Sequence, residues 1–181
     1  MKTEPLILII QVQSATRKDR NRQISDPLCK GSVLQGSIEG NRGLIGPNTR
    51  LMTLQNGAGH EDLLKEFVDE DHIVIGTTED NGAVLGMGHV RRGGTGVTNV
   101  GMLVEDKEGF LPQLKEAFDQ CGFNVKIHEN IQTLIWDKLF TNVSLSALTG
   151  VLQVDMGYIA ANEYAWDLCC QLIHETVKNS S

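Results

Sequence analysis

The stretch Arg50-Leu-Met-Thr-Leu-Gln-Asn-Gly-Ala-Gly59 decides the fold class of this chain of 181 residues. Its apolar part, Leu51 to Leu54, predicts a buried strand that we expect to span 50–55. The glycine-rich end predicts a turn, and apolar residues at helical spacing begin near His60. A strand that runs through a glycine turn into a helix is the repeating unit of α/β proteins.

The alternation of short strands and helices continues to about residue 128. The expected elements are a helix over 61–68, a strand over 72–78, strands over 83–91 and 97–104 joined by a turn at 91–96, a helix over 108–121 that Gly122 ends, and a strand over 123–127. After residue 130 the pattern becomes helical, over about 131–147 and 158–178. We therefore expect an α/β fold, a partial Rossmann-like domain followed by the start of an all-helical domain.

The first 40 residues fit this pattern poorly. Leu6–Ile10 is apolar enough to form a buried parallel strand, but the residues after it are polar, basic or turn-rich and predict no long helix. Residues 1–50 carry a net charge of +4, whereas residues 51–181 carry a net charge of −11. We therefore expect 1–40 to be an atypical, irregular segment, followed by domains over 41–128 and 129–181.

Bulk composition excludes several functional classes. The net charge of −7 argues against nucleic acid or an anionic membrane surface as the main partner. No apolar run approaches the ~18 residues that a membrane-spanning helix needs. The four cysteines form no Cys-x-x-Cys motif, and the five histidines form no metal-ligand cluster. We expect free thiols in a reducing cytoplasm and no metal site.

Lys138, Asn142 and Ser146 lie four residues apart in an otherwise apolar helical stretch. Each such step on an α-helix turns by only about 40°, so the three polar side chains share one narrow stripe. Burial lowers the pKa of a lysine, which suits it to proton transfer. The alternative is a lysine whose ammonium group reaches solvent beside two solvated polar residues.

Asn56 lies where the first expected strand ends, and ligands of open α/β sheets bind beyond the carboxyl ends of strands. Its amide supplies donors and an acceptor, and Gly57 and Gly59 let the backbone approach a ligand closely. The alternative is an Asn-Gly turn without a ligand. Residues 77–80 are further candidates, for which the alternative is a solvated loop. Gly94-x-Gly96 indicates a hairpin, because the dinucleotide fingerprint needs a helix after it.

Several motifs occur in a fixed order along the chain. They are Leu54-Gln-Asn-Gly-x-Gly59, Gly86-x-Gly-His-Val90, Arg92-x-Gly-x-Gly96 and Ile135-Trp-x-Lys-Leu-x-x-Asn142-x-x-x-x-x-Leu148-Thr. Together they resemble the ketopantoate reductase family (2-dehydropantoate 2-reductases) over about residues 40–175. The resemblance implies an oxidoreductase that uses NADPH (NADP) to reduce 2-dehydropantoate to (R)-pantoate, in pantothenate and coenzyme A biosynthesis.

The same resemblance implies roles for individual residues. Lys138 matches the family's catalytic lysine, which protonates the ketone oxygen of the substrate as hydride arrives at carbon. Asn142 matches a substrate-binding asparagine, and Asn56 one that contacts the nicotinamide cofactor near the substrate. Ser146, which we also expect to bind substrate, stands where the family usually has a second asparagine, and Met156-Gly157 stands where it often has Asn-Gly.

Parts of the family pattern are not found in the sequence. No complete Gly-x-Gly-x-x-Gly occurs, the motif that holds the cofactor pyrophosphate. The family's later Ser and Glu, which bind substrate and cofactor, have no counterpart in the sequence. We therefore expect a truncated fragment from a displaced reading frame or a truncated gene, with 41–128 as a partial dinucleotide-binding domain and 129–181 as the start of the substrate and dimerisation domain. An exposed sheet edge would make such a fragment marginally stable or self-associating.

Two other interpretations stay open. Ser146 and Met156 favour a reductase of the same family that acts on a different 2-oxo acid. The missing phosphate loop favours a catalytically inactive remnant that serves as a binding or dimerisation module. In the enzyme interpretations the partner is a small 2-oxo acid. We expect a cytoplasmic protein without nucleic-acid or membrane partners, and a homodimer is left open.

Overall fold

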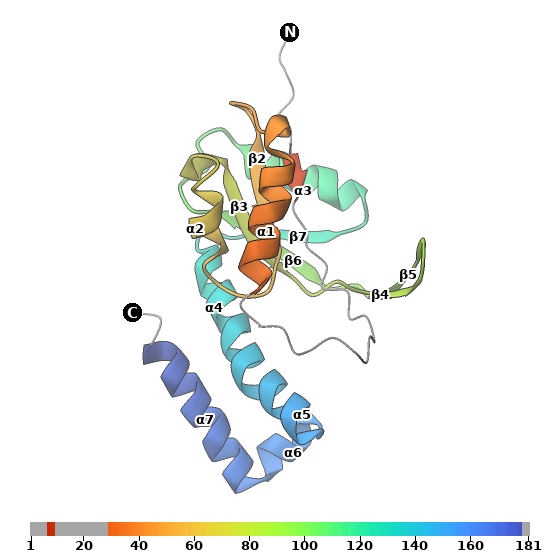
Figure 1. Ribbon diagram of the computed structural model, residues 1–181, viewed down its shortest axis with the longest axis vertical. Helices are drawn as coiled ribbons and strands as arrows, with labels where there is room; N and C mark the ends of the chain where they lie inside the picture. The colour runs from red at the N-terminus through yellow and green to blue at the C-terminus, as the bar shows by residue number, and fades with distance from the viewer. Residues whose placement is uncertain (1–6, 10–28, 179–181) are drawn as a thin grey trace. The chain divides into compact units, whose positions relative to one another are not determined.

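The computed structural model describes residues 7–9 and 29–178 (Figure 1). The described part of the chain folds into two compact units. Unit 1 contains the described residues up to Gln55 together with Gly59–Gln132, and it carries the strands. Unit 2 contains Asn56–Ala58 together with the residues from Thr133 onward, and it is helical.

The sheet of unit 1 has five strands in the order β1-β2-β3-β6-β7. They are β1 (Ile7–Ile9), β2 (Arg50–Thr53), β3 (Ile73–Thr78), β6 (Val97–Met102) and β7 (Asn124–Ile127). The first three are parallel, β6 is antiparallel to β3, and β7 is parallel to β6. This mixed α/β sheet confirms the predicted fold class, and β1 confirms the parallel strand predicted within Leu6–Ile10.

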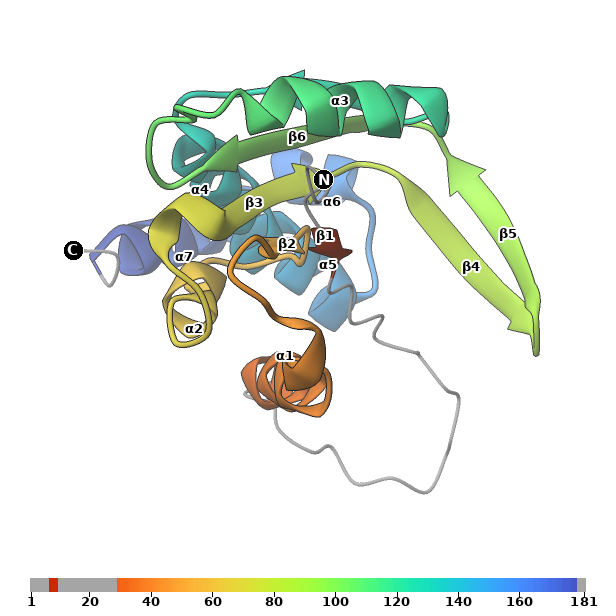
Figure 2. The ribbon, with the colours of Figure 1, turned by 90° about the horizontal axis from the view of Figure 1, so that it is seen from above.

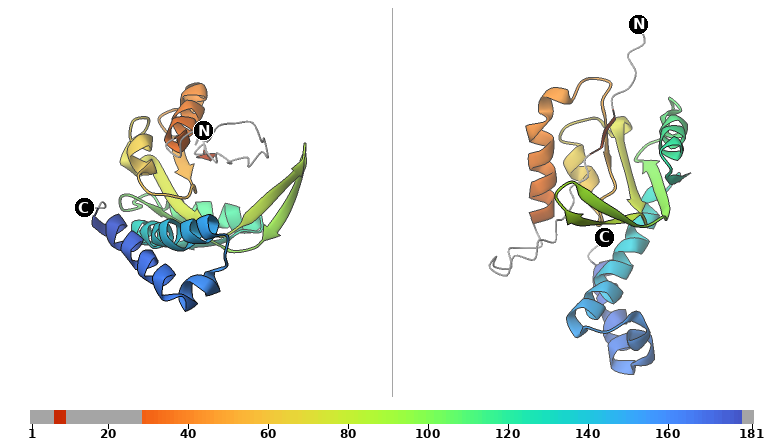
Figure 3. Two further views of the ribbon diagram at one scale, coloured as in Figure 1. Left: turned by 60° about the horizontal axis from the view of Figure 1, so that its bottom comes forward. Right: turned by 90° about the vertical axis from the view of Figure 1, so that its right-hand side faces the viewer.

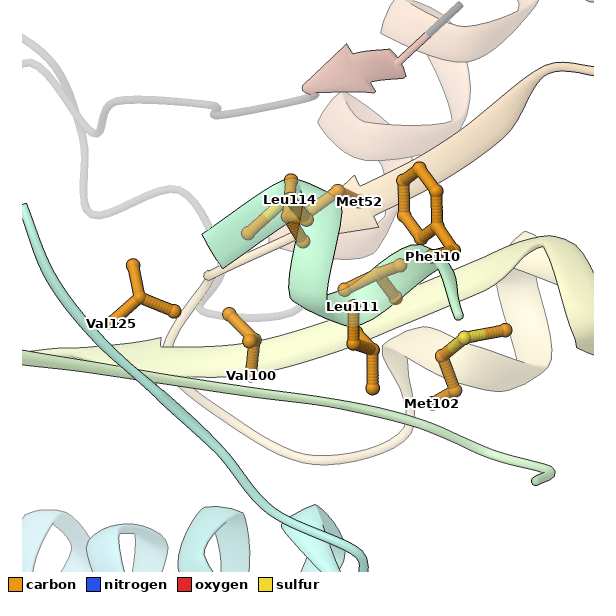
Figure 4. Packing of buried hydrophobic residues seen from close by; sticks show 8 residues of the cluster. Met52, Val100, Met102, Phe110, Leu111, Leu114 and Val125 are labelled. Carbon is orange, nitrogen blue, oxygen red and sulfur yellow. The ribbon is translucent and has the colours of Figure 1, made fainter. Parts of the chain in front are cut away.

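Helices cover both faces of this sheet (Figures 2 and 3). One face carries α1 (Cys29–Gly40) and α2 (His60–Leu64), and the other carries α3 (Phe110–Gln120). Successive side chains of a strand point to opposite faces, so alternate positions of the strands are buried under different helices. Figure 4 shows the core under α3, which consists of Met52, Val74, Val100, Met102, Phe110, Leu111, Leu114 and Val125.

Helix α1 contradicts the prediction that residues 1–40 are irregular, at least over 29–40. Its sequence includes Gly31, Gly36 and Gly40, which lower intrinsic helix propensity by about 1 kcal/mol each. Leu34 and Ile38, one turn apart, are fully buried in the core. Tertiary burial therefore outweighs propensity here. The predicted irregular stretch over 10–28 lies outside the described residues.

The turn predicted at 91–96 is wrong. Strands β4 (Asn81–Gly86) and β5 (His89–Gly94) form a separate hairpin whose turn is Met87–Gly88, with Gly88 at φ 69°. Strand β5 occupies the predicted turn as far as Gly94. Gly93 and Gly96 instead allow other parts of the chain to pass close by. A Cβ at Gly93 would collide with the Asn81 side chain, and one at Gly96 would collide with Glu79.

Unit 2 is built from one long helical run and two further helices. Helix α4 (Ile131–Thr141) continues through a π-helical turn (Asn142–Ser146) into α5 (Ala147–Leu152), and α6 (Met156–Ala161) and α7 (Glu163–Lys178) follow. Figure 1 shows α7 returning beside the π turn, which it contacts. Leu148, Ile159, Ala165 and Cys169 form the buried core. The helical character predicted after residue 130 is confirmed.

Candidate active site

The loop after β2 lies at the carboxyl edge of the parallel strands, the edge at which ligands of α/β sheets bind. Thr53 is buried, and its Oγ1 accepts a hydrogen bond from the Gln55 N–H at 3.3 Å. Gly57 and Gly59 then take φ angles of 112° and 84°, which side-chain-bearing residues rarely adopt. The strand, the glycine turn and the helix from His60 therefore occur as predicted, and Asn56 is exposed at the start of the turn.

Lys138 lies near the end of α4 and is partly buried. Asn142 begins the π turn and is partly buried, whereas Ser146 ends it and is exposed. A π turn takes more residues per revolution than an α turn, so the step from Asn142 to Ser146 rotates less than the α-helical spacing predicts. Ser146 consequently stays closer to the line through Lys138 than eight residues of α-helix would place it.

Hydroxyl groups bond the backbone around the π turn. Ser144 Oγ donates to Phe140 O at 2.6 Å, and Thr141 Oγ1 donates to Asp137 O at 3.3 Å. Such bonds to the preceding turn compete with the regular helical ladder and often bend helices. The sequence prediction of a regular helix over 131–147 missed this turn, although the hydroxyl residues were its local signal. Single π turns are rare and are frequent at functional sites.

The loop residues Asn56–Ala58 belong to unit 2 with Thr133 and the residues after it, although Asn56 follows a strand of the sheet. Lys138, Asn142 and Ser146 belong to the same unit. All four predicted site residues are therefore brought into one compact part of the molecule. They provide an ammonium group, two amides and a hydroxyl, groups that can bind and polarise an anionic, carbonyl-containing compound.

The candidate residues 77–80, at the end of β3 and directly after it, are engaged in structural bonds. Thr78 Oγ1 lies 2.9 Å from Thr98 Oγ1, and the Glu79 carboxylate accepts from the Val97 N–H at 3.3 Å. Asp80 forms an ion pair with Arg92 at 2.9 Å. Thr77 is buried and accepts from the Asn99 amide at 3.4 Å. For Thr77 the structure replaces the solvated loop with a buried strand position.

Within the described ranges no three His, Cys, Asp or Glu side chains gather as a metal site would require. No helix there is long and apolar enough to cross a membrane. Among the described side chains Cys121, Cys169 and Cys170 are free thiols.

Two family models match this sequence. The one described as ketopantoate reductase PanE/ApbA matches residues 28–105, and the one described as its C-terminal part matches residues 130–179. Together these spans cover more than half of the chain. The chain belongs to the ketopantoate reductase family. The first span includes α1, so the family match begins earlier than the motifs near residue 40 indicated.

Curated relatives of this ketopantoate reductase chain carry the name 2-dehydropantoate 2-reductase. The protein from Streptococcus pyogenes is 26% identical over 148 residues, which are 82% of this chain and 48% of the relative. The protein from Pyrococcus horikoshii is 30% identical over 132 residues, which are 72% of this chain and 43% of the relative. The chain thus spans about half the length of the curated relatives it matches.

Solved structures of other proteins share the fold. A D-mandelate dehydrogenase in complex with NADH has a TM-score of 0.74 and 28% identity, over 82% of this chain and 50% of that one. The 2-dehydropantoate 2-reductase of Geobacter metallireducens has a TM-score of 0.70 and 24% identity, over 81% of this chain and 49% of that one.

Proposed function

We propose that this chain carries the lysine-bearing part of a reductase that uses NADPH to convert 2-dehydropantoate to pantoate. The observation that carries the proposal is the grouping of Asn56, Lys138, Asn142 and Ser146 in one compact unit. The family match over both sets of residues supports it. The choice of 2-dehydropantoate comes from the names of the curated relatives.

The residues present fit the nicotinamide end of such a cofactor. Gly57 and Gly59 have positive φ angles and no side chain, so the backbone of the loop can approach a ligand closely. The space beside Gly59 is open, because a Cβ there would meet nothing within 4 Å. Asn56 and this backbone would hold the nicotinamide and its ribose. The sequence offers no Gly-x-Gly-x-x-Gly loop for the pyrophosphate. When bound, the cofactor supplies hydride to the carbonyl carbon.

The chain's own side chains supply the other requirements of the reaction. Lys138 holds a proton at Nζ, donates it to the ketone oxygen and stabilises the developing alkoxide by its charge. The Asn142 amide and the Ser146 hydroxyl bind oxygen atoms of the substrate and fix its orientation. The apolar side chains on either side of the lysine, among them buried Ile135, limit the access of water.

A second candidate is a reductase of a 2-oxo acid that lacks the hydroxyl group of 2-dehydropantoate. Ser146 has a shorter reach than the asparagine expected there, and Met156, 55% exposed, has no polar group that could bind that hydroxyl. A solved D-mandelate dehydrogenase shares the fold and binds NADH. For this second candidate function, NADH is therefore the first cofactor to test, before NADPH.

The direct test is to titrate the purified chain with NADPH and with NADH, and then to follow cofactor oxidation with a panel of 2-oxo acids. The proposal expects NADPH binding and turnover of 2-dehydropantoate above the other acids. Turnover of a different 2-oxo acid would favour the second candidate. Failure to bind either cofactor would contradict both and would favour an inactive remnant that only binds partners.

A further inference from the structure

The π turn of unit 2 interrupts the helical run that carries Lys138. It spans Asn142–Ser146, between α4 and α5. The Ala147 N–H bonds to Asn142 O, five residues earlier, and to Ser144 O. A regular α-helix would use Val143 O instead, four residues earlier. The turn therefore places an additional residue between the donor and the acceptor of this backbone bond.

Ser144 supplies a buried hydroxyl group inside this turn. Its side chain is buried, and its Oγ donates to Phe140 O at 2.6 Å. In a regular α-helix Phe140 O accepts the backbone N–H of Ser144, so the hydroxyl competes with the backbone for this acceptor. The hydroxyl bond is thus a local cause that favours the wider turn at this position over other positions in the run.

The helix after the turn is fixed by the core of unit 2. Leu148 of α5 is buried in one cluster with Ile159 of α6 and with Ala165 and Cys169 of α7. Helix α7 also contacts the π turn itself. A close-packed core fixes the direction in which Leu148 points. Loss of the Ser144 hydroxyl should therefore move the additional residue along the helical run and should not remove it.

The position of the π turn sets the angles between the predicted site residues. In a regular α-helix, Lys138 and Ser146 would lie about 80° apart around the helix axis, because eight residues separate them. The π turn between Asn142 and Ser146 makes this angle smaller. A turn at another position would change the angle between one pair of these side chains. Misplacement of a reacting group by about 1 Å can lower a rate by about 100-fold.

We propose that Ser144 is a positioning residue: its hydrogen bond to Phe140 O keeps the π turn between Asn142 and Ser146, and thereby sets the polar side chains at the angles that the substrate requires. Ser144 does not touch the substrate in this proposal. The part that concerns the substrate rests on the proposed function. The part that concerns the π turn rests on contacts within unit 2 alone.

The test uses two substitutions of Ser144 and one matched control. Ser144→Ala removes the hydroxyl group, and Ser144→Thr keeps a hydroxyl that can bond to the carbonyl four residues earlier. Thr176→Ala is the control, because Thr176 Oγ1 donates to Leu172 O at 2.8 Å within the regular helix α7. If Ser144→Ala does not fold, Ser144→Cys, whose S–H is a weak donor, takes its place in both measurements.

The first measurement is independent of activity. The scalar coupling across a hydrogen bond, measured by NMR on the isotope-labelled full chain, identifies the carbonyl group that accepts from a given amide. We expect the Ala147 amide to couple to the Asn142 carbonyl in the wild-type chain, in Ser144→Thr and in Thr176→Ala. In Ser144→Ala we expect it to couple to the Val143 carbonyl.

The second measurement is steady-state kinetics with NADPH and 2-dehydropantoate. Ser144→Ala should lower kcat/KM for 2-dehydropantoate at least tenfold and leave KM for NADPH within about twofold. Ser144→Thr should recover most of kcat/KM, and Thr176→Ala should match wild type.

Two results would overturn the proposal. One is an Ala147 amide that still couples to Asn142 in Ser144→Ala, and the other is a changed acceptor with an unchanged kcat/KM. If the wild-type chain reduces no 2-oxo acid, the proposed function fails, and the scalar coupling alone decides whether Ser144 holds the π turn.

Discussion

Lys115 and Asp119, one turn apart on α3, form an ion pair at 2.6 Å that also closes the outer edge of the sheet. Lys115 Nζ donates to Val125 O at 2.8 Å, and Asp119 Oδ1 accepts from the Val125 N–H at 3.3 Å. Val125 lies on β7, a strand at the edge of the sheet. At alternate residues of an edge strand, the backbone N–H and C=O groups point away from the sheet. The ion pair therefore occupies backbone groups that another strand would otherwise bind.

The pKa of Asp119 predicts how this contact responds to pH. The hydrogen bond from Lys115, followed by that from the Val125 N–H, lowers the pKa of the carboxyl below its usual 3.8. The stabilisation is thus complete above about pH 4 and is lost as the pH falls through the lowered value. We expect Asp119→Asn to lower the urea midpoint at pH 7, with the difference from wild type shrinking toward pH 3. Glu116→Gln on the same helix is the control, and a pH-independent difference would contradict the prediction.

Gly101 and Gly150 should respond oppositely to replacement by alanine. A Cβ at Gly101 would crowd Ile131 and the His128 carbonyl, so Gly101→Ala should destabilise unit 1 by about 1–3 kcal/mol. Gly150 lies in α5 with open space around an added Cβ, so Gly150→Ala should stabilise by about 0.5–1 kcal/mol. Urea unfolding of both variants measures these free energies. Equal effects of the two substitutions would show that Ile131 of α4 does not pack closely against Gly101 of β6.

Ser146 should tune the choice of substrate. Ser146→Asn restores a longer amide, so we expect kcat/KM for 2-dehydropantoate to rise about tenfold relative to a 2-oxo acid without a hydroxyl group. Thr141→Asn, an exposed neighbour on the same helical run, should leave the ratio unchanged. An unchanged ratio for Ser146→Asn would remove Ser146 from the substrate site.

Exposed apolar side chains of unit 2 predict self-association. Val151 is 79% exposed on α5, and Tyr164 is 85% and Trp166 52% exposed on α7. We expect analytical ultracentrifugation to show concentration-dependent association that Tyr164→Lys weakens and Tyr164→Phe preserves. A monomer at all concentrations with one cooperative melt would contradict this expectation.

Local patterns in the sequence were enough to predict β2, its glycine turn and the following helix. They were not enough for α1, since its glycines disfavour a helix, whereas the burial of Leu34 and Ile38 stabilises it. They also misplaced the hairpin turn, because Gly93 and Gly96 look like turn residues, whereas in the fold a Cβ at Gly93 would collide with Asn81 and one at Gly96 with Glu79.

The sequence was enough to nominate residues for the candidate site, but not to predict how these residues are arranged. The spacing of Lys138, Asn142 and Ser146 is visible in the sequence, but the π turn between the last two is not part of a regular helical pattern. The association of Asn56 with the helical unit depends on residues about 80 positions apart, which no local pattern contains. The hydrogen bond between His128 and Asn99, which lie 29 positions apart, is tertiary for the same reason.

The proposed role of Lys138 as proton donor is tested by single-turnover reduction of 2-dehydropantoate by the NADPH-loaded chain. Lys138→Ala should lower the rate of NADPH oxidation by about 10²–10⁴-fold with little change in NADPH affinity. Lys178→Ala, which removes an exposed lysine near the end of α7, should react at the wild-type rate. A Lys138→Ala variant that reduces 2-dehydropantoate as fast as wild type would show that Lys138 is not the proton donor.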